Sequence, residues 1–366
     1  MEKILGFGCM RLPFKDEEVD YDEFKKMVDY YMSHGFNYFD TAHGYLSGKS
    51  EIAIRECLAK RYKREEYVLT NKLSKPFFDK ESDIRPLFES QLEACGVDYF
   101  DYYLMHAQDR EVYLHFLKTN AYEVAKQLKE EGKIKHIGIS FHDTSDILEK
   151  ILKDHPEIEV VQIQFNYLDF KSPSVQSEKL YKLCEKYKKK VLIMEPVKGG
   201  KLVNLPRDAK EVFDNLNDGK YSYASYALRF AGEFKAVYKV LSGMSDLKQV
   251  KDNVKTFKNF KPLNEEEEKA IVKVRKIISK LNSIPCTACR YCTDGCPKNI
   301  SIPDLFACYN NKIQFNDWNA TYYYNIHTKL KGKAKDCIKC GQCEKICPQH
   351  LKIRELLEKV SREFDK

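Results

Sequence analysis

The segment from His136 to Pro196 contains the alternation that decides the fold. It holds three short apolar runs, HIGIS (136–140), VVQIQFN (160–166) and KVLIMEP (190–196), separated by more polar stretches. The unit repeats about every 28 residues, roughly the length of one strand plus one helix, and this alternation favours a parallel sheet.

Further runs of the same kind lie on both sides of this segment: ILGFG (4–8), FNYFDTA (36–42), YVLTNKL (67–73), DYYLMH (101–106) and VYKVLSGM (237–244). Between the runs lie helical patterns. In the stretch 83–95, apolar residues recur at the three- and four-residue spacing of one helix face: Ile84, Leu87, Phe88, Leu92 and Cys95. Eight strand–helix units in about 255 residues predict an α/β fold, a (β/α)8 TIM barrel. An open doubly wound sheet is the alternative, but it usually has fewer strands and a glycine-rich first turn, which this chain lacks.

The predicted barrel ends in a helix that begins with a capping box at Asn264–Glu267. The apolar face of this helix consists of Ile271, Val274, Ile277, Ile278 and Leu281. We expect the helix to close the barrel. Because the stretch 282–285, Asn-Ser-Ile-Pro, breaks it, we place the domain boundary there, with a barrel domain at 1–281 and a second domain at 282–366.

The second domain contains eight of the chain's 13 cysteines. They form two runs of the pattern C-x2-C-x2-C-x3-C-P, at 286–297 and 337–348, which is the spacing of bacterial two-cluster ferredoxins. In that arrangement the fourth cysteine of each run binds the other cluster. We therefore predict one [4Fe–4S] cluster on Cys286, Cys289, Cys292 and Cys347, and another on Cys337, Cys340, Cys343 and Cys296. Structural zinc is the alternative, but it usually uses two C-x2-C pairs rather than runs of four.

The rest of this domain favours a small, mostly helical ferredoxin-like module. Helical patterns begin at Pro303 and at Ile353, and the segment between the two cysteine runs is longer than in a minimal ferredoxin. Cys308 lies outside both runs and is expected in the core, as are Cys57, Cys95 and Cys184 on the barrel helices.

Composition limits the setting and the partners. The chain lacks a membrane-spanning apolar stretch and a signal-peptide pattern, so we expect a cytoplasmic protein, where thiols stay free to bind metal. The formal net charge is +7 with the lysines dispersed, and two clusters of about −2 each would reduce it to roughly +3. This excludes the concentrated basic face of a nucleic-acid-binding protein, but a small acidic electron-donor protein, a ferredoxin or flavodoxin, could use the surface.

Four polar residues follow the predicted strands in the order Asp40, Tyr45, Lys72 and His106, at the barrel end where active sites lie. This set resembles the catalytic tetrad of the aldo-keto reductase family, and the cysteine domain resembles that family's iron–sulfur-fused branch. The resemblance covers residues 3–258 and includes GFG (6–8), GIS (138–140), QFN (164–166) and EPVKGG (195–200). It implies that Tyr45 donates a proton, that Lys72 lowers the pKa of Tyr45 and Asp40 holds Lys72, and that His106 orients a carbonyl oxygen.

The resemblance also implies a nucleotide cofactor site after the later strands. The positions carried over are Gly8, Met10, Ser140, Gln164, Met194, Pro196, Lys198, Gly200, Lys201, Gly243, Ser245, Gln249 and Asn253. The chain departs from the family here. Met194 replaces the aromatic residue that stacks on the nicotinamide, Phe141 replaces an amide residue, and Gly243 and Gln249 replace the basic residues that bind the 2′-phosphate of NADP.

The cofactor therefore stays open between FMN and NAD(P)H. Electron counting favours a flavin at or near the nicotinamide position, because a cluster passes one electron at a time and a flavin converts single electrons into pairs. The leading hypothesis is an oxidoreductase of an anaerobic setting that reduces a carbonyl or another polarised double bond of a small molecule with electrons from two [4Fe–4S] clusters. The alternatives are an NAD(P)H-dependent reductase with structural clusters and a non-catalytic redox sensor.

Overall fold

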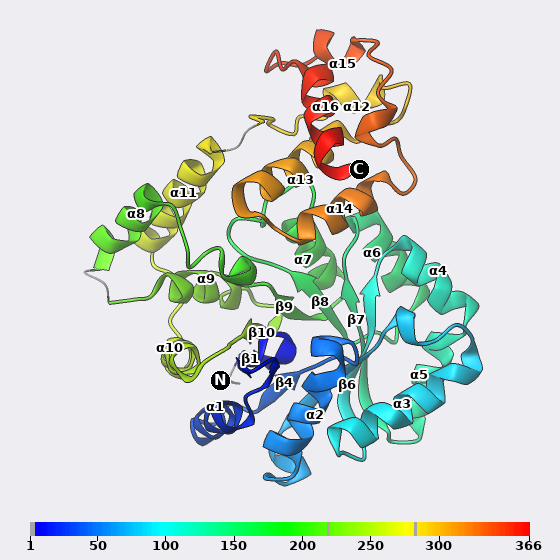
Figure 1. Cartoon of the computed structure of the whole chain (residues 1–366), viewed down its shortest axis with the longest axis vertical. Coiled ribbons are helices and arrows are strands. Elements are labelled where there is room, and N and C mark those ends of the chain that lie inside the picture. Colours follow the sequence, from blue (N-terminus) through cyan, green and yellow to red (C-terminus); the bar gives the residue numbers. More distant parts are fainter. Residues whose placement is uncertain (1–3, 218–219, 282–283) are drawn as a thin grey trace.

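The structure is a computed structural model that describes residues 4–217, 220–281 and 284–366, and it has two parts (Figure 1). The first part is a closed barrel of eight parallel strands, in which β1 pairs with both β10 and β4. The strands are β1 (Leu5–Gly8), β4 (Tyr38–Asp40), β5 (Val68–Leu73), β6 (Phe100–Gln108), β7 (Ile134–Phe141), β8 (Val160–Gln164), β9 (Lys190–Met194) and β10 (Val237–Gly243). Each of the eight apolar runs forms one strand, so the predicted barrel is confirmed.

Helices surround the barrel: α1 (Tyr21–Ser33), α2 (Lys49–Ile54), α3 (Glu81–Cys95), α4 (Arg110–Lys118), α5 (Ala121–Glu130), α6 (Ser145–Asp154), α7 (Ser177–Lys186), α8 (Arg207–Asn217), α9 (Tyr223–Gly232), α10 (Leu247–Lys258) and α11 (Glu265–Lys280). The predicted face of α3 is buried in full. A short hairpin, β2 (Phe14–Lys15) and β3 (Glu18–Val19), follows β1 and was not predicted. No helix in these described ranges is both long enough and apolar enough to span a bilayer.

The strands are apolar on both sides because both sides are buried. The helices cover the outer side, and the inside of the barrel is filled by a separate cluster: Tyr38, Tyr102, Leu104, Val160, Leu192 and Leu241. The hydroxyl of Tyr38 is satisfied inside the barrel, where it accepts a hydrogen bond of 2.7 Å from Thr70 Oγ1. The barrel is therefore a filled core, and chemistry is restricted to its carboxyl end.

Helix α11 differs from the prediction in where it packs. The capping box is present, since the Asn264 side chain accepts from the Glu267 amide and Glu267 accepts from the Asn264 amide. The helix does not close the barrel, however. It packs beside α8, and Glu267 forms a buried ion pair with Arg229 of α9. Leu281, assigned to its apolar face, is 52% exposed because the helix projects beyond the elements that bury its earlier turns.

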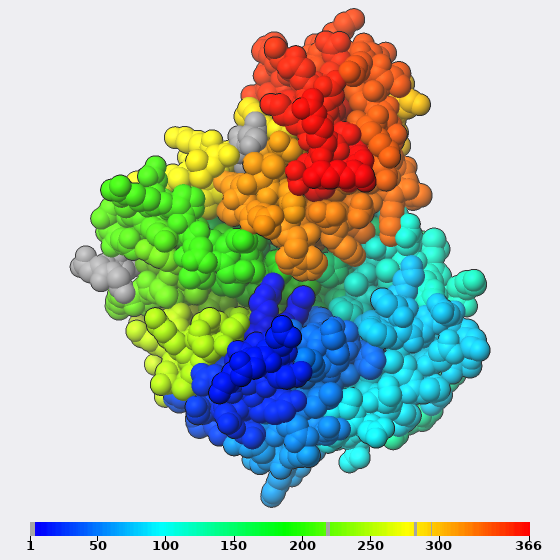
Figure 2. All heavy atoms as spheres, in the orientation of Figure 1, coloured from blue at the N-terminus to red at the C-terminus, as the bar shows by residue number. Residues whose placement is uncertain are grey.

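The second part is the C-terminal domain, residues 284–366, with helices α12 (Tyr291–Asp294), α13 (Ile302–Phe315), α14 (Asn319–Thr328), α15 (Gln342–Lys345) and α16 (Ile353–Phe364). Figure 2 shows this domain, coloured orange to red, seated against the barrel. Its core includes Val175 from the loop after β8, and His327 of α14 hydrogen-bonds the carbonyl of Ser174 at 3.1 Å. The predicted boundary at 282 lies outside the described residues.

Candidate active site

The carboxyl ends of β4 and β5 hold a buried ion pair. Lys72 Nζ donates to Asp40 Oδ1 at 2.7 Å and to the carbonyl oxygen of Thr41 at 2.7 Å, and both Asp40 and Lys72 are buried. Burial disfavours the ammonium, but the charges of Asp40 and Tyr45 more than offset this and raise the pKa of Lys72. Lys72 is therefore a fixed positive charge at this end of the barrel.

Tyr45 lies in the loop after β4, at the start of a short helix, Tyr45–Gly48. Leu46 and Ser47, which follow it, have φ values of 54° and 56°, so the chain turns sharply here. Lys72 Nζ lies 4.8 Å from the centre of the Tyr45 ring. The sharp turn after Tyr45 thus places its ring near Lys72 at the mouth of the barrel.

His106 lies on β6, facing Tyr45. The two ring centres are 5.9 Å apart and the ring planes are 74° apart. Ser74 Oγ lies 2.6 Å from His106 Nδ1, which leaves Nε2 without a hydrogen-bond partner among the described residues. Burial, with a smaller contribution from the charge of Lys72, lowers the pKa of His106 well below its usual range. The ring is therefore neutral at neutral pH and can hydrogen-bond a ligand.

The pKa of Tyr45 departs from the expectation. Lys72 does lower it, but burial of the phenol is the larger cause, and the net pKa is raised above the ordinary value. The sequence shows the nearby ammonium but not the cost of burying a phenolate. Tyr45 therefore keeps its proton at neutral pH, which suits a proton donor rather than a base.

A layer of buried polar side chains fixes the strand that carries Lys72. Glu51 Oε1 accepts from Asn71 Nδ2 at 2.7 Å, and Asn71 Oδ1 accepts from the amide of Lys72 at 2.8 Å. Gln91 donates to the carbonyl of Lys72 at 3.0 Å and accepts from Tyr103. These hydrogen bonds hold the backbone at Lys72 in one position, which preorganises the ion pair. The sequence analysis did not identify this layer.

The opposite side of the barrel mouth, at the ends of β9 and β10, contains a groove of about 560 Å³. Its lining includes some of the predicted cofactor residues: Pro196, Gly200, Gly243, Ser245, Gln249 and Asn253. It also includes Arg11 and Lys248, which the sequence analysis missed. Arg11 Nη2 lies 3.6 Å from Glu195 Oε1. Ser245 Oγ donates a hydrogen bond of 2.9 Å to the backbone carbonyl oxygen of Arg11. The groove offers glycine backbone amides and two cationic side chains, a set suited to a phosphate-bearing ligand.

Two side chains predicted to hold a nicotinamide amide are engaged inside the protein. Ser140 Oγ accepts from the amide of Ala107 at 2.7 Å. Gln164 Nε2 donates to Asp169 at 2.9 Å, and Gln164 Oε1 accepts from the hydroxyl of Tyr323 at 3.2 Å. Tyr323 belongs to α14, so the C-terminal domain itself contacts the end of β8.

The prediction that Lys198 contacts the cofactor needs a correction. Lys198 is buried, and its Nζ lies 2.9 Å from Asp169 and 3.1 Å from Asp317 of the C-terminal domain. Burial opposes the charge, but these two carboxylates raise the pKa of Lys198. Lys198 does not line the groove, because its ammonium group links the barrel to the C-terminal domain.

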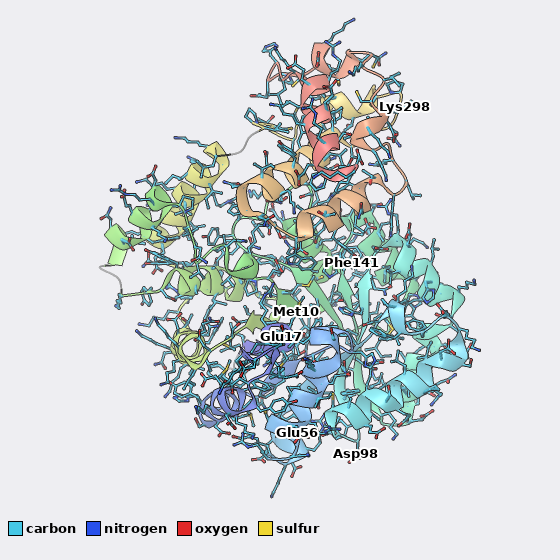
Figure 3. The ribbon with its side chains drawn as sticks, in the orientation of Figure 1. Met10, Glu17, Glu56, Asp98, Phe141 and Lys298 are labelled. Atoms are coloured by element: carbon cyan, nitrogen blue, oxygen red, sulfur yellow. The ribbon has the colours of Figure 1, made fainter. Side chains whose placement is uncertain are left out.

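The other predicted cofactor positions also lie outside the lining of this groove. Gly8 lies within the barrel sheet, beside Gly243 of β10 and Asp40 of β4, and Met194 lies beside Gln164 of β8. Lys201 directly follows the short helix Lys198–Gly200. Met10 is 40% exposed, and Figure 3 places it below Phe141 at the centre of the molecule.

The C-terminal domain contains two cavities whose linings match the crossed assignment. Cys286, Cys289, Cys292 and Cys347 line one small cavity, and Cys296, Cys337, Cys340 and Cys343 line the other. Each cavity thus takes three cysteines from one run and one from the other. No group of His, Cys, Asp or Glu in the described ranges is arranged around a single metal ion. Each donor set is all thiol and surrounds a volume, so it fits a cluster better than one zinc ion. Cys57, Cys95, Cys184 and Cys308 are buried, as expected.

Contacts of α14 with the barrel are the main feature that sequence reasoning missed. Tyr322 lies edge-on to His142, with ring centres 5.5 Å apart, and Lys329 pairs with Asp109 at 3.2 Å and Glu111 at 2.7 Å. The run of three tyrosines at 322–324 was the available signal, since a run of aromatic residues between cysteine motifs suggests an interface.

A barrel with this tetrad, joined to an eight-cysteine domain, defines a class of redox enzyme. The chain belongs to the aldo/keto reductase family, whose model matches residues 4–276, and residues 285–351 match the model of a 4Fe-4S dicluster domain.

Similar proteins are also oxidoreductases. An uncharacterized oxidoreductase, YqkF of Bacillus subtilis, is 25% identical over 73% of this chain and 90% of its own. The NADH-specific methylglyoxal reductase of Escherichia coli is 26% identical over 60% of this chain and 78% of its own. The solved structure of the aldo-keto reductase AKR11C1 from Bacillus halodurans (holo form) superposes with a TM-score of 0.62 at 26% identity, covering 74% of this chain and 91% of that one. The chain is thus an oxidoreductase of this family with a 4Fe-4S domain.

Proposed function

We propose that the protein reduces a carbonyl or another polarised double bond of a small molecule at Tyr45, with electrons passed through two [4Fe–4S] clusters and a bound flavin, FMN. The observation that carries the proposal is the joining of the Tyr45–Lys72–Asp40–His106 arrangement to two four-cysteine cavities in one chain.

The residues at the barrel mouth would act on the substrate in a defined way. His106 Nε2 donates a hydrogen bond to the substrate oxygen and orients it toward Tyr45. Tyr45 transfers its phenolic proton to that oxygen as the bond is reduced, and Lys72 stabilises the phenolate that forms. Asp40 keeps Lys72 charged and in place. The proton is thus supplied by the protein, and the electrons come from elsewhere.

The cysteines would hold the clusters in the crossed pattern, Cys347 with the first run and Cys296 with the second. The clusters would supply single electrons and the flavin would collect them in pairs. Arg290, which borders the first cavity, forms an ion pair of 2.7 Å with Asp304 and so holds the loop of the first run against α13.

Electrons would enter at the second cavity. Residues of the C-terminal domain alone line it, whereas Cys286 of the first cavity also borders a groove shared with the barrel. Ile338 and Ile346 beside the second run are 56% and 54% exposed. These apolar side chains and the neighbouring exposed Lys345 suit the docking of a small acidic electron carrier, a ferredoxin or flavodoxin. The cytoplasm of an anaerobic cell is the proposed setting.

Two parts of the barrel mouth bear on where a cofactor would bind. The groove of about 560 Å³ suits the phosphate of FMN. The groups expected to hold a nicotinamide amide are engaged elsewhere, since Ser140 contacts Ala107 and Gln164 contacts Tyr323 of α14, and Phe141 offers no amide.

Anaerobically purified protein tests the proposal. It should contain about eight iron and eight sulfide per chain, release a flavin on denaturation and reduce small aldehydes with a reduced ferredoxin as the donor. Protein with clusters but without flavin, which reduces no aldehyde with any donor protein, would contradict the proposal.

An NADH-dependent carbonyl reductase with structural clusters is the second candidate. It is favoured by the E. coli relative, whose name gives NADH as the reductant, and by the absence of basic side chains at Gly243 and Gln249 for a 2′-phosphate. Turnover of methylglyoxal with NADH and no donor protein would select this candidate.

A further inference from the structure

A second groove, of about 480 Å³, runs along the seam between the barrel and the C-terminal domain. It is separate from the tetrad and from the groove at β9 and β10, and its volume falls in the range of roughly 300–1,000 Å³ that is typical of small-molecule sites. Its walls come from the loop after β8, from α11, from the first cysteine run and from α13.

Two helix faces line this seam opposite each other (Figure 1). On α11 the lining residues are Val272, Arg275, Lys276, Ile278 and Ser279, most of which follow the spacing of one helix face. On α13 they are Pro303, Ala307, Asn310, Asn311, Gln314 and Phe315, most of which also follow one face. The two helices contact each other where Gln314 Nε2 donates to the carbonyl of Ile278 at 2.8 Å. Over the rest of their length the two faces are held apart rather than packed.

The groove is positively charged. Arg275, Lys276 and Lys171 all line it, and none has an ion-pair or hydrogen-bond partner for its side-chain charge in the described ranges. Arg275 is half-buried, and that burial lowers its pKa, although the charge of Glu178 on α7 acts in the opposite direction. The lining carboxylate, Asp169, is already paired with Lys198 at 2.9 Å.

The groove also has an apolar side and borders the first cysteine run. Leu168 and Phe315 supply apolar surface, and Cys286, Thr287 and Ala288 form one wall. Cations on one side and apolar side chains on the other suit an anion that carries a ring. Three positive side chains would also offset the negative charge of a cluster at Cys286.

We propose that this seam binds a phosphorylated planar molecule of about mononucleotide size, held by Arg275, Lys276 and Lys171 and placed against the loop of Cys286. The site is independent of the barrel mouth, and occupation would change the surroundings of the neighbouring cluster. The shared chemistry is a phosphate on a ring system, so AMP and FMN serve as probes, with inorganic phosphate as the arm without a ring.

The test uses the cluster-loaded protein under anaerobic conditions. We expect AMP and FMN to bind at micromolar concentration and phosphate at least tenfold more weakly. The double variant Arg275→Gln/Lys276→Gln should weaken AMP binding at least tenfold. Lys273→Gln is the matched control, because Lys273 is exposed on the same helix and does not line the groove. It should bind AMP like the unchanged protein.

A spectroscopic readout separates this site from the groove at β9 and β10. AMP carries no electrons, yet it should alter the EPR signal of one reduced cluster, and this change should vanish in the double variant. The proposal is overturned if no probe binds at 1 mM, if binding depends on Lys248 of the other groove instead of Arg275 and Lys276, or if AMP binds without changing either cluster signal. A protein that binds AMP through Arg275 but reduces no aldehyde would leave this inference standing while contradicting the proposed function.

Discussion

The two sides of the barrel mouth differ in whether their side chains are arranged for the roles that the sequence predicts. At β4, β5 and β6, the four predicted catalytic side chains lie together, with Lys72 2.7 Å from Asp40 and the Tyr45 ring near both Lys72 and His106. At the ends of β7, β8 and β9, residues expected to hold a cofactor instead contact the protein, and Gln164 and Lys198 contact the C-terminal domain. The residues proposed for proton transfer and those expected to hold the cofactor thus come from different strands of one barrel.

Tyr45→Phe should produce the largest effect, because it removes the proposed proton donor at the ends of β4 to β6. We expect turnover to fall by roughly 10²–10⁴-fold with little change in cofactor affinity, since the proton acts in the transition state. Steady-state kinetics with an aldehyde measure this, and Tyr291→Phe, at an exposed position in the C-terminal domain, is the control. Near-normal turnover in Tyr45→Phe would mean that this side of the mouth has lost its role.

Cys347→Ser tests the electron-supplying side. Because Cys347 lines the cavity of the first run, the variant should lose about half of its iron, from the cluster held by Cys286, Cys289 and Cys292. Cys308→Ser, which changes a buried cysteine outside both cavities, should keep both clusters. EPR of the reduced protein distinguishes the clusters, and loss of the one held by the second run would refute the crossed ligation.

Lys198→Met should destabilise the link between the domains. It leaves Asp169 and Asp317 buried without their cation, which typically costs about 3–5 kcal/mol. Thermal unfolding should begin at a lower temperature, and limited proteolysis should release the C-terminal domain faster. Lys201→Met, at the other end of the same loop, is the matched control. Equal stability of the two variants would show that the ion pair does not hold the domains together.

Tyr323→Phe should have a smaller effect. It removes the hydroxyl that donates to Gln164, a contact worth about 1 kcal/mol, and frees the side-chain oxygen of Gln164 to accept from a ligand. NADH should then bind roughly fivefold more tightly in a fluorescence titration. In Tyr324→Phe the lost hydroxyl contacts Asp365 inside the C-terminal domain, so NADH affinity should stay the same. A Tyr323→Phe variant with unchanged affinity would show that this contact does not exclude a nicotinamide.

Local patterns predicted most of the barrel and the grouping of Asp40, Lys72 and His106 at its mouth. Apolar runs such as 160–166 form strands wherever both faces are buried, and residues at strand ends, such as Asp40 and Lys72, necessarily meet at one end of a closed barrel. The crossed cysteine pattern followed from spacing, and the two cavities have the expected linings.

The contacts between the barrel and the C-terminal domain could not be predicted from local patterns. Tyr323 and Gln164 are 159 residues apart in the sequence, and Lys198 and Asp317 belong to different domains. No local periodicity reports such contacts, because they depend on how two finished domains dock. The raised pKa of Tyr45 was missed for a related reason, since burial depends on the complete surroundings of a side chain and not on the nearest charge.

The most direct test of the account is a single turnover without any nicotinamide. The clusters are reduced anaerobically, excess reductant is removed, and the protein is mixed with a small aldehyde while visible absorbance and alcohol product are followed. Two reduced clusters hold two electrons and a reduced flavin holds two more, enough with four protons to reduce two carbonyl groups. The account predicts that the clusters reoxidise and up to two alcohol molecules form per chain in the unchanged protein, and that both events slow together in Tyr45→Phe. Clusters that stay reduced in the presence of aldehyde, or that reoxidise equally fast in both proteins, would contradict it.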